Sequence, residues 1–354
     1  GQPTFLTRCL TRPGGALKLR AAMKVFPGFE AARGGLAGCA VALGNFDGVH
    51  LGHQALFREA VARARARGAA AVAATFDPHP GKVLAPQLAP RLLMPLGRRL
   101  ALMESCGLDA VVVQPFDRAY AGLGPQGFLE RDLFGALAPG DVVVGPDFTF
   151  GRGREGTVLS LRKACEERGV GFAEVPAVTC EGVVVSSTKV REFVAEGRVE
   201  AAARLLGRPF ELCGEVVHGR GRGRTFGFPT ANLAIESEVR PRTGVYAVRV
   251  FFAGEFCGGA ANIGIKPTFG ERDLTIEIFL FDFEGDLYGQ RIAVEFVERL
   301  RNEQHFASVE ELAAEISRDC DRAREALARV EPPGPQSPWR CSPATCCGRS
   351  SAWC

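Results

Sequence analysis

Two histidines stand three residues apart in the stretch GNFDGVHLGHQ, Gly44–Gln54, of a chain with five histidines. An apolar run precedes this stretch and a helical pattern follows it, which indicates a strand-to-helix turn. Free backbone N–H groups and the helix dipole favour an anion at such a turn, so we predict a nucleotide phosphate site. The predicted binding residues are Gly44, Asn45, Phe46, Asp47, Gly48, His50, Gly52 and His53.

His50 and His53 are the candidate catalytic residues of this site. Imidazole groups aimed at a phosphate stabilise the charge that builds on its oxygens when one group attacks and another leaves. A zinc site is one alternative, but it needs further ligands, and only Asp47 lies nearby in sequence. A purely structural histidine pair is the other alternative.

A second anion-binding pattern is SSTKVR, residues 186–191. Ser187 and Thr188 place hydroxyls at the start of an expected helix, and Arg191 follows one turn later. These groups are suited to bind a second anion. In the alternative interpretation, Ser187 or Thr188 only caps the helix.

A third candidate site lies in VVHGRGRGRTFGFPTANL, residues 216–233. The run of Gly and Arg could bind RNA, but no flanking basic residues support that interpretation. The run therefore favours a flexible loop over a phosphate, in which Gly219 and Gly227 contact the nucleotide. Thr230 and Asn232 are two residues apart, so on an extended segment both side chains point the same way. Their oxygens are suitable ligands for Mg²⁺ held jointly with ATP.

Three further side chains could contact a substrate. Glu277 lies between Ile276 and Ile278, so period-two alternation places it on the opposite strand face from both; a solvated acid is the simpler interpretation. In GPDFTFG, Asp147 could hold a polar edge of a ligand, and Phe148 could stack or pack. For His79, between two prolines, structural and substrate-facing roles remain equal alternatives.

Short apolar runs alternate with helical patterns through the first half of the chain, which predicts a parallel α/β sheet. The expected strands cover residues 39–46, 69–76, 110–116, 141–148 and 169–176, and the expected helices 53–68, 95–107, 124–137 and 158–169. Ligands bind at the carboxyl ends of such strands. Residues 188–207 are expected to form one linker helix.

The second half has strand patterns joined by turns that contain glycine, which favours an antiparallel barrel or sandwich. The expected strands cover 210–219, 243–254, 255–264, 274–283 and 290–300. A helix with an apolar stripe follows at 308–327. The predicted fold is therefore a Rossmann-like parallel-sheet domain followed by an antiparallel β-barrel with a C-terminal helix.

Composition limits the class of protein. The net charge of +3 comes from dispersed residues, so it does not indicate a nucleic-acid partner, and no apolar run reaches the ~20 residues that span a bilayer. The cysteines between residues 23 and 330 are scattered with no CxxC pair, as in a reduced cytoplasmic protein. We expect residues 1–22 to be an extension, or alternatively a transit peptide, and 331–354 to be a disordered tail.

Several fragments, taken in order, resemble the bifunctional riboflavin kinase/FAD synthetase family. The stretch at Gly44–His53 has the HxGH signature of nucleotidylyltransferases, and TFDPHP, VVVGPDFTFGRGREG and VSSTKVREFVAEG follow as in the adenylyltransferase module. GFPTAN, NIGIKPTFG, TIEIFLFDFEGDLYGQ and VERLRNEQHFASVEEL are similar to the kinase module. The resemblance covers residues 23–330. Lys266 is a small departure, since Arg is as frequent there.

The resemblance implies an FMN adenylyltransferase domain at 23–187 and a riboflavin kinase domain at 208–330. It implies that Thr230 and Asn232 hold Mg²⁺ with ATP, that Glu277 is the general base on the ribityl hydroxyl, and that Asp147, Phe148 and Arg301 contact flavin. The expected substrates are riboflavin, FMN and ATP. Two alternatives are an adenylyltransferase for another phosphorylated small molecule, fused to an unrelated barrel, and an inactive flavin- or RNA-binding regulator.

Overall fold

The strands of the first half form one parallel sheet. The computed structural model describes residues 22–218, 230–268 and 271–332. The sheet has the order β1-β4-β3-β2-β5-β8, and every neighbouring pair is parallel. Its strands are β1 (Lys24–Phe26), β2 (Ala40–Leu43), β3 (Ala71–Asp77), β4 (Ala110–Pro115), β5 (Asp141–Val144) and β8 (Gly171–Glu174). The five expected strands are present, and the edge strand β1 is additional because three residues carry too little pattern to be predicted.

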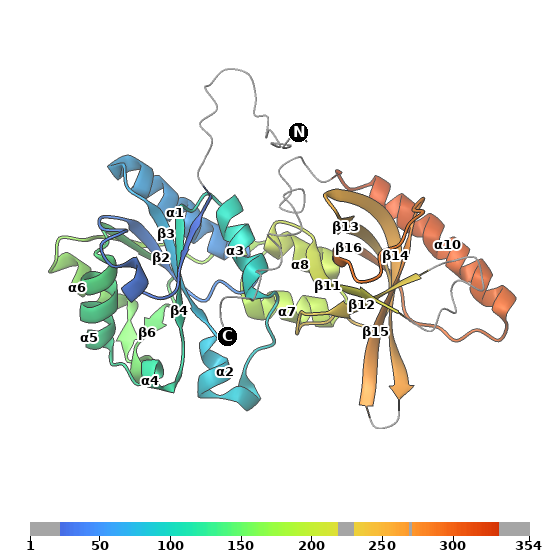
Figure 1. Ribbon diagram of the computed structural model, residues 1–354, viewed down its shortest axis with the longest axis horizontal. Helices are drawn as coiled ribbons and strands as arrows, with labels where there is room; N and C mark the ends of the chain where they lie inside the picture. Colours follow the sequence, from blue (N-terminus) through green and yellow to red (C-terminus); the bar gives the residue numbers. More distant parts are fainter. Residues whose placement is uncertain (1–21, 219–229, 269–270, 333–354) are drawn as a thin grey trace, which may run out of the picture.

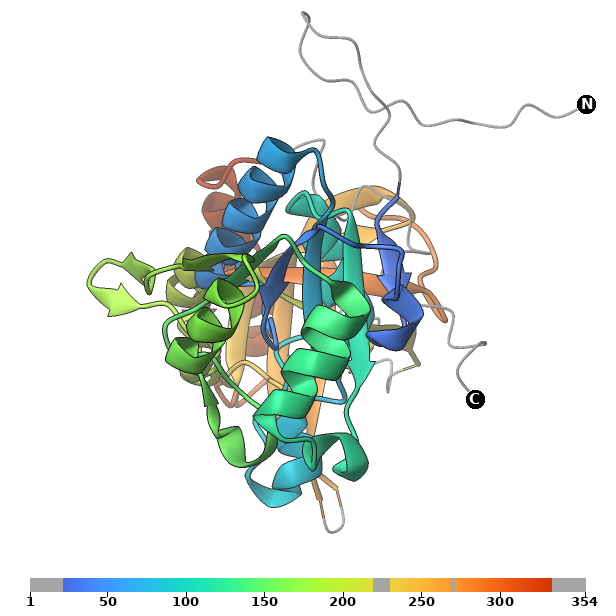
Figure 2. The same ribbon diagram turned by 90° about the vertical axis from the view of Figure 1, so that its left-hand side faces the viewer.

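Helices cover both faces of this sheet (Figures 1 and 2). Helices α1 (Leu51–Arg67) and α3 (Leu96–Ser105) pack on one face, while the π-helix η3 (Phe128–Leu137) and α6 (Val158–Glu166) pack on the other. The shorter helices are α2 (Pro80–Leu84), α4 (Arg118–Ala121) and α5 (Pro125–Gly127). The short strand pairs are β6 (Thr149–Phe150) with β7 (Gly156–Thr157), and β9 (Thr179–Cys180) with β10 (Val183–Val184). Both faces are thus buried, and the carboxyl ends of the strands remain for ligand binding.

The second half is a closed antiparallel barrel, as predicted. The strand order is β11-β12-β15-β14-β13-β16. The strands are β11 (Phe210–Val217), β12 (Thr230–Ile235), β13 (Gly244–Phe252), β14 (Glu255–Thr268), β15 (Glu271–Leu280) and β16 (Arg291–Arg301). Helix α10 (Val309–Ala328) covers the outside of the barrel and buries Cys320 and Ala323 against Phe281. Strand β12, which follows the Gly/Arg-rich segment, was not among the expected strands.

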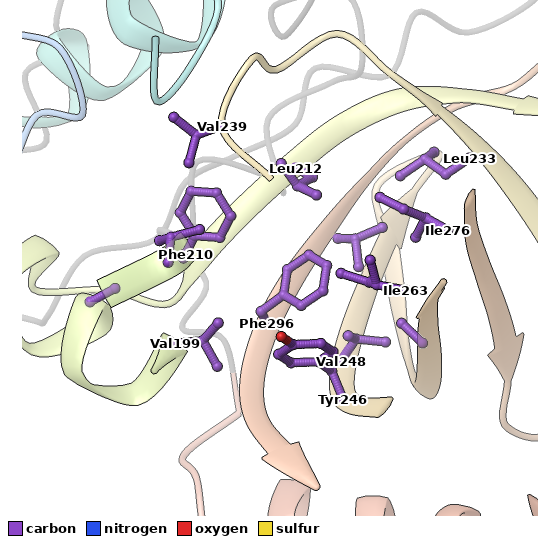
Figure 3. Packing of buried hydrophobic residues seen from close by; sticks show 14 of the residues in the cluster. Val199, Phe210, Leu212, Leu233, Val239, Tyr246, Val248, Ile263, Ile276 and Phe296 are labelled. Atoms are coloured by element: carbon purple, nitrogen blue, oxygen red, sulfur yellow. The ribbon is translucent and has the colours of Figure 1, made fainter. Parts of the chain in front are cut away.

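The expected single helix at 188–207 is wrong, because two helices occupy this segment. Helix α7 (Ser187–Ala195) ends before Gly197, whose φ is +78°, and α8 (Val199–Leu206) follows. Both helices lie between the parallel sheet and the barrel (Figure 1). Their apolar side chains join the barrel core, where Val199 lies near Phe210 and Phe296 (Figure 3). The left-handed turn at Gly197 lets two short apolar faces close one end of the barrel.

Ion pairs connect the α/β domain to the barrel. The fully buried Arg98 of α3 pairs with Glu211 of β11, whose side chain is also buried. Lys82 pairs with Glu238, which also accepts a hydrogen bond from the Leu92 N–H at 2.9 Å. Burying a charge is costly unless it is paired, so the buried Arg98–Glu211 pair requires the two domains to dock together. The Lys82–Glu238 pair is partly exposed and adds a second contact between them.

The predicted terminal segments fall mostly outside the described residues, since 1–21 and 333–354 are not described. Within the described part, no helix combines the length and the apolar character needed to cross a membrane.

Candidate active sites

The stretch Gly44–His50 follows β2, as predicted, and forms a tightly held turn at the carboxyl edge of the sheet. The carbonyl of Asn45 accepts hydrogen bonds from Thr75 Oγ1 at 3.1 Å and from Arg99 at 2.8 Å. Gly48 has a φ of +88°, and a Cβ there would lie 2.6 Å from Leu93 Cδ1. Only glycine therefore fits this position. Sequence reasoning missed Arg99, because its partner is 54 residues away.

The two histidines lie face to face at the start of α1. His50 is the N-cap of α1, and its Nδ1 accepts a hydrogen bond from the His53 N–H at 3.4 Å. The two rings stack with centroids 3.5 Å apart and planes 20° from parallel. The pair therefore shapes the start of α1, and its rings lie at the end of the helix where free backbone N–H groups favour an anion.

Both imidazoles are neutral near pH 7. Burial, followed by the charges of Arg208 and Arg191, lowers the pKa of His50 to about 4. Burial, followed by His50, Arg99 and Arg208, holds the pKa of His53 well below its ordinary value. A neutral ring carries one N–H, so each histidine can donate to a phosphate oxygen without bringing a charge of its own.

The segment after β10 joins the same site, as the sequence suggested. Ser187 Oγ donates to the Asp47 carbonyl at 2.8 Å, and Arg191 donates to the Asp47 carboxylate at 2.6 Å. Asp47 is 3% exposed and also accepts from the Leu93 N–H at 3.0 Å. Asp47 therefore fastens three segments together, and in this structure it holds the arginine that was predicted to grip phosphate.

The helix cap is a different serine from the two considered. Ser186 is the N-cap of α7 and accepts a hydrogen bond from the Lys189 N–H at 3.2 Å. Thr188 is exposed in the first turn of α7. The alternative role of Ser187 or Thr188 as a simple cap is therefore wrong, because the cap position is already filled by Ser186.

The two side chains near β5 that are predicted to contact flavin differ in their exposure to solvent. Asp147 is exposed just after β5, and the Phe148 ring stacks on Phe150 with centroids 5.9 Å apart. Phe150 itself is buried in the core. His79 caps α2 by accepting from the Gly81 N–H at 3.1 Å, which gives it a structural role, and burial lowers its pKa.

In the barrel, strand pairing brings together the residues predicted to act in phosphorylation by ATP. Asn232 of β12 lies directly opposite Glu277 of β15, and Glu277 lies opposite Asn262 of β14. Ile276 and Ile278 point into the barrel core, so Glu277 lies on the outer face. Residues directly opposite on neighbouring strands share a face, so Asn232 and Asn262 flank Glu277 there, with Thr230 two residues away from Asn232. Sequence reasoning missed Asn262, since only the pairing register reveals it.

Arg301, which the resemblance assigns to flavin binding, forms ion pairs with α10. Its guanidinium donates to both carboxylate oxygens of Asp319 on α10, at 2.7–3.0 Å, and lies 3.7 Å from Glu315. These contacts join the end of β16 to α10 and use the charge of Arg301 within the protein. Gly219 and Gly227 lie outside the described residues.

The outer face of the barrel carries side-chain oxygen atoms that could bind a metal ion. Thr230 and Asn232 carry a hydroxyl and an amide oxygen, which are ligands of the kind that a hard cation such as Mg²⁺ prefers. Across residues 22–218, 230–268 and 271–332, no three His, Cys, Asp or Glu side chains gather as a metal site would require.

The fold and the two sites define a two-module transferase that uses nucleotides.

Comparison with known proteins identifies the modules. The family model for FAD synthetase matches residues 34–189, and the model for riboflavin kinase matches residues 206–327. The bifunctional riboflavin kinase/FMN adenylyltransferase of Escherichia coli (strain K12) is 42% identical over 296 residues, which are 83% of this chain and 95% of that protein. The protein of the same name from Bacillus subtilis (strain 168) is 38% identical over 288 residues, 80% of this chain and 90% of that protein.

A solved structure from Streptococcus pneumoniae, described as a macrolide-efflux protein, has a TM-score of 0.78 and 30% identity, and covers 88% of this chain and all of that chain. The chain belongs to the bifunctional riboflavin kinase/FMN adenylyltransferase family. It is an enzyme that converts riboflavin to FMN and FMN to FAD.

Proposed function

We propose that the two half-reactions are carried by the two sites described above, one in each module. In the barrel, the carboxylate of Glu277 takes the proton from the terminal ribityl hydroxyl of riboflavin. That oxygen attacks the γ-phosphorus of ATP, the bond from this phosphorus to the β–γ bridging oxygen breaks, and FMN and ADP are the products. The position of Asn232 directly opposite Glu277 is the observation that carries this assignment.

Thr230 and Asn232 would hold Mg²⁺ with the phosphates of ATP, since both supply oxygen ligands on the same strand face as Glu277. When bound, the ion neutralises charge on the β- and γ-phosphates. The protein's own part is to present the hydroxyl to the base and to orient the phosphates for in-line attack.

In the α/β domain, a phosphate oxygen of FMN attacks the α-phosphorus of a second ATP, and pyrophosphate leaves. His50 and His53 donate neutral N–H groups to oxygens whose charge grows in the transition state. Ser187, Thr188 and Arg191 bind the departing phosphates. For this, Arg191 must release its hydrogen bond to the Asp47 carboxylate and donate to the phosphates instead. We place the FMN beside Asp147 and Phe148, and we assign Arg301 a structural role between β16 and α10.

We further propose that the enzyme works in the cytoplasm on small molecules alone. The seven cysteines named among the described residues are all free thiols, which supports a reducing compartment. The dispersed charge and the net value of +3 give no support to a nucleic-acid partner.

The decisive experiment is a time course with purified protein, riboflavin, ATP and Mg²⁺, in which products are separated by chromatography. FMN should appear first and FAD should follow. The ADP released should equal the sum of FMN and FAD, and the pyrophosphate should equal the FAD. A parallel reaction with excess EDTA should form neither flavin nucleotide. Folded protein that forms neither product with Mg²⁺ present would overturn the proposal.

A further inference from the structure

The turn that carries the histidine pair contains an unusual backbone conformation. Phe46, Gly48 and Val49 all have positive φ angles, of 53°, 88° and 42°. The left-handed region is open to glycine but disfavoured for other residues, and a β-branched residue such as Val49 is a clear outlier there. A strained turn of this kind persists only where the surrounding structure holds it in place.

The carbonyls of Gly48 and Val49, in the strained part of this turn, are held by a residue that lies just before the first strand of the barrel. Arg208 donates to the Gly48 carbonyl at 2.7 Å and to the Val49 carbonyl at 3.0 Å, one guanidinium nitrogen to each. Gln54 of α1 donates to the same Val49 carbonyl at 3.0 Å and to the Leu206 carbonyl at 2.9 Å. The strained carbonyls are thus fastened to the segment that connects α8 to β11.

Close packing supports this contact. Gly207 has a φ of +70°, and a Cβ there would lie 2.7 Å from Leu51 Cδ2, in the first residue of α1. The chain therefore passes directly against the helix that follows the turn. Nearby, Arg98 of the α/β domain pairs with Glu211, three residues after Arg208, so docking is fixed on both sides of Arg208.

The hydrogen bonds of Arg208 join the two modules of the chain. The region matched by FAD synthetase ends at residue 189, and the region matched by riboflavin kinase begins at residue 206. Arg208 therefore lies in the kinase-matched region, while its partners Gly48 and Val49 lie in the adenylyltransferase. Its pKa, lowered chiefly by burial to about 10, still leaves it charged near pH 7.

We propose that Arg208, although part of the kinase module, is a positioning residue for adenylyl transfer, because its guanidinium fixes the strained turn that presents His50 and His53. This inference rests on the proposed role of the two histidines. It makes FAD formation depend on docking of the barrel, while riboflavin phosphorylation stays independent of Arg208.

The test measures both activities of the full-length enzyme in Arg208→Ala and Arg208→Lys. With FMN supplied, kcat for FAD formation should fall roughly 10- to 100-fold in Arg208→Ala. A misplacement of catalytic groups by about 1 Å can lower the rate of a reaction by up to about 100-fold. The KM for ATP should change less than fivefold, and FMN formation from riboflavin should stay within twofold. Arg208→Lys should recover part of the loss, because one ammonium keeps the charge but cannot reach two carbonyls as a fork does.

Arg204→Ala is the matched control, since Arg204 lies on α8 with a half-exposed side chain paired to Glu181 at 3.0 Å. It should leave both activities unchanged. Amide hydrogen exchange of residues 45–50 should rise in Arg208→Ala and not in the control. If Arg208→Ala fails to fold, Gln54→Leu decides, because it removes one tie to Val49 without removing a charge; it should lower kcat for FAD formation selectively.

Normal FAD formation in the folded Arg208 variants, or an equal loss of both activities, overturns the inference. Failure of the proposed function looks different, because the wild-type enzyme would then form no FAD, or His53→Ala would leave FAD formation intact.

Discussion

Asn232 on β12 and Glu277 on β15 occupy directly opposed positions in the barrel, so an amide and a carboxylate lie side by side on its outer face. Forty-five positions separate them in the chain, and antiparallel pairing alone brings them together. This relationship places a potential base beside oxygen ligands for a metal, which is the arrangement that phosphoryl transfer to a hydroxyl requires.

Replacing Glu277 by Gln keeps the side-chain shape and removes the base. Riboflavin phosphorylation should fall by roughly 10²–10⁴-fold, the range that general-base catalysis contributes. Conversion of supplied FMN to FAD should proceed at nearly the wild-type rate, as measured by chromatography of each half-reaction. The control is Glu255→Gln, an exposed acid at the start of β14. Loss of both half-reactions in Glu277→Gln would indicate a folding role instead.

His53→Ala tests the other module. Loss of one preorganised donor to a developing charge typically costs ~10²–10³ in rate, so FMN should accumulate from riboflavin with little FAD. Riboflavin consumption should remain normal, which also shows that the protein is folded. His53→Ala and Glu277→Gln serve as reciprocal controls. If each substitution damages both steps equally, the two sites are not separate.

The barrel fragment should need α7 and α8. Residues 187–330 should fold and form FMN but no FAD, whereas residues 208–330 should be far less stable. The second fragment loses apolar side chains of both helices that are buried in the barrel core, among them Phe193, Val199 and Leu206. Each such side chain contributes about 1.5–3 kcal/mol on burial, and several together rival the ~5–15 kcal/mol that stabilise a domain. Thermal unfolding of the two fragments compares them, and equal stability would contradict this account of the core.

Glu295 should make the enzyme less stable as pH rises. Burial, followed by repulsion from Glu211, raises the pKa of Glu295 to about 7. Its favourable contribution is complete below the unfolded-state value near 4.5 and is lost as pH rises through 7, by an amount on the order of 3 kcal/mol. Urea unfolding at pH 5 and pH 8 should show this decline in wild type and a flatter dependence in Glu295→Gln. An equally steep decline in the variant would assign the effect to another group.

The local patterns of the chain determined much of what was found. Apolar runs of strand length alternate with helical patterns up to Glu174, and short-range sterics turn that alternation into a parallel sheet. The position of Gly44–His53 just after an apolar strand fixed its place at the carboxyl edge of the sheet. The spacing of Thr230 and Asn232 likewise places both side chains on one side of any extended segment, although the strand β12 itself was not predicted. Each of these features depends on neighbours within a few residues, which is why sequence suffices.

Other features arose only from contacts between distant segments. The break between α7 and α8 lets both helices cover one end of the barrel. Arg301 at the end of β16 pairs with Asp319 of α10, and the local sequence around Arg301 does not reveal this partner. Asn262 joined Glu277 through register, and Arg208 reached Gly48 across 160 positions. A side chain with several possible partners takes the one that burial and docking bring within hydrogen-bond distance. That choice belongs to the packed molecule, because the free energy of a buried charge depends on groups that the local sequence does not contain.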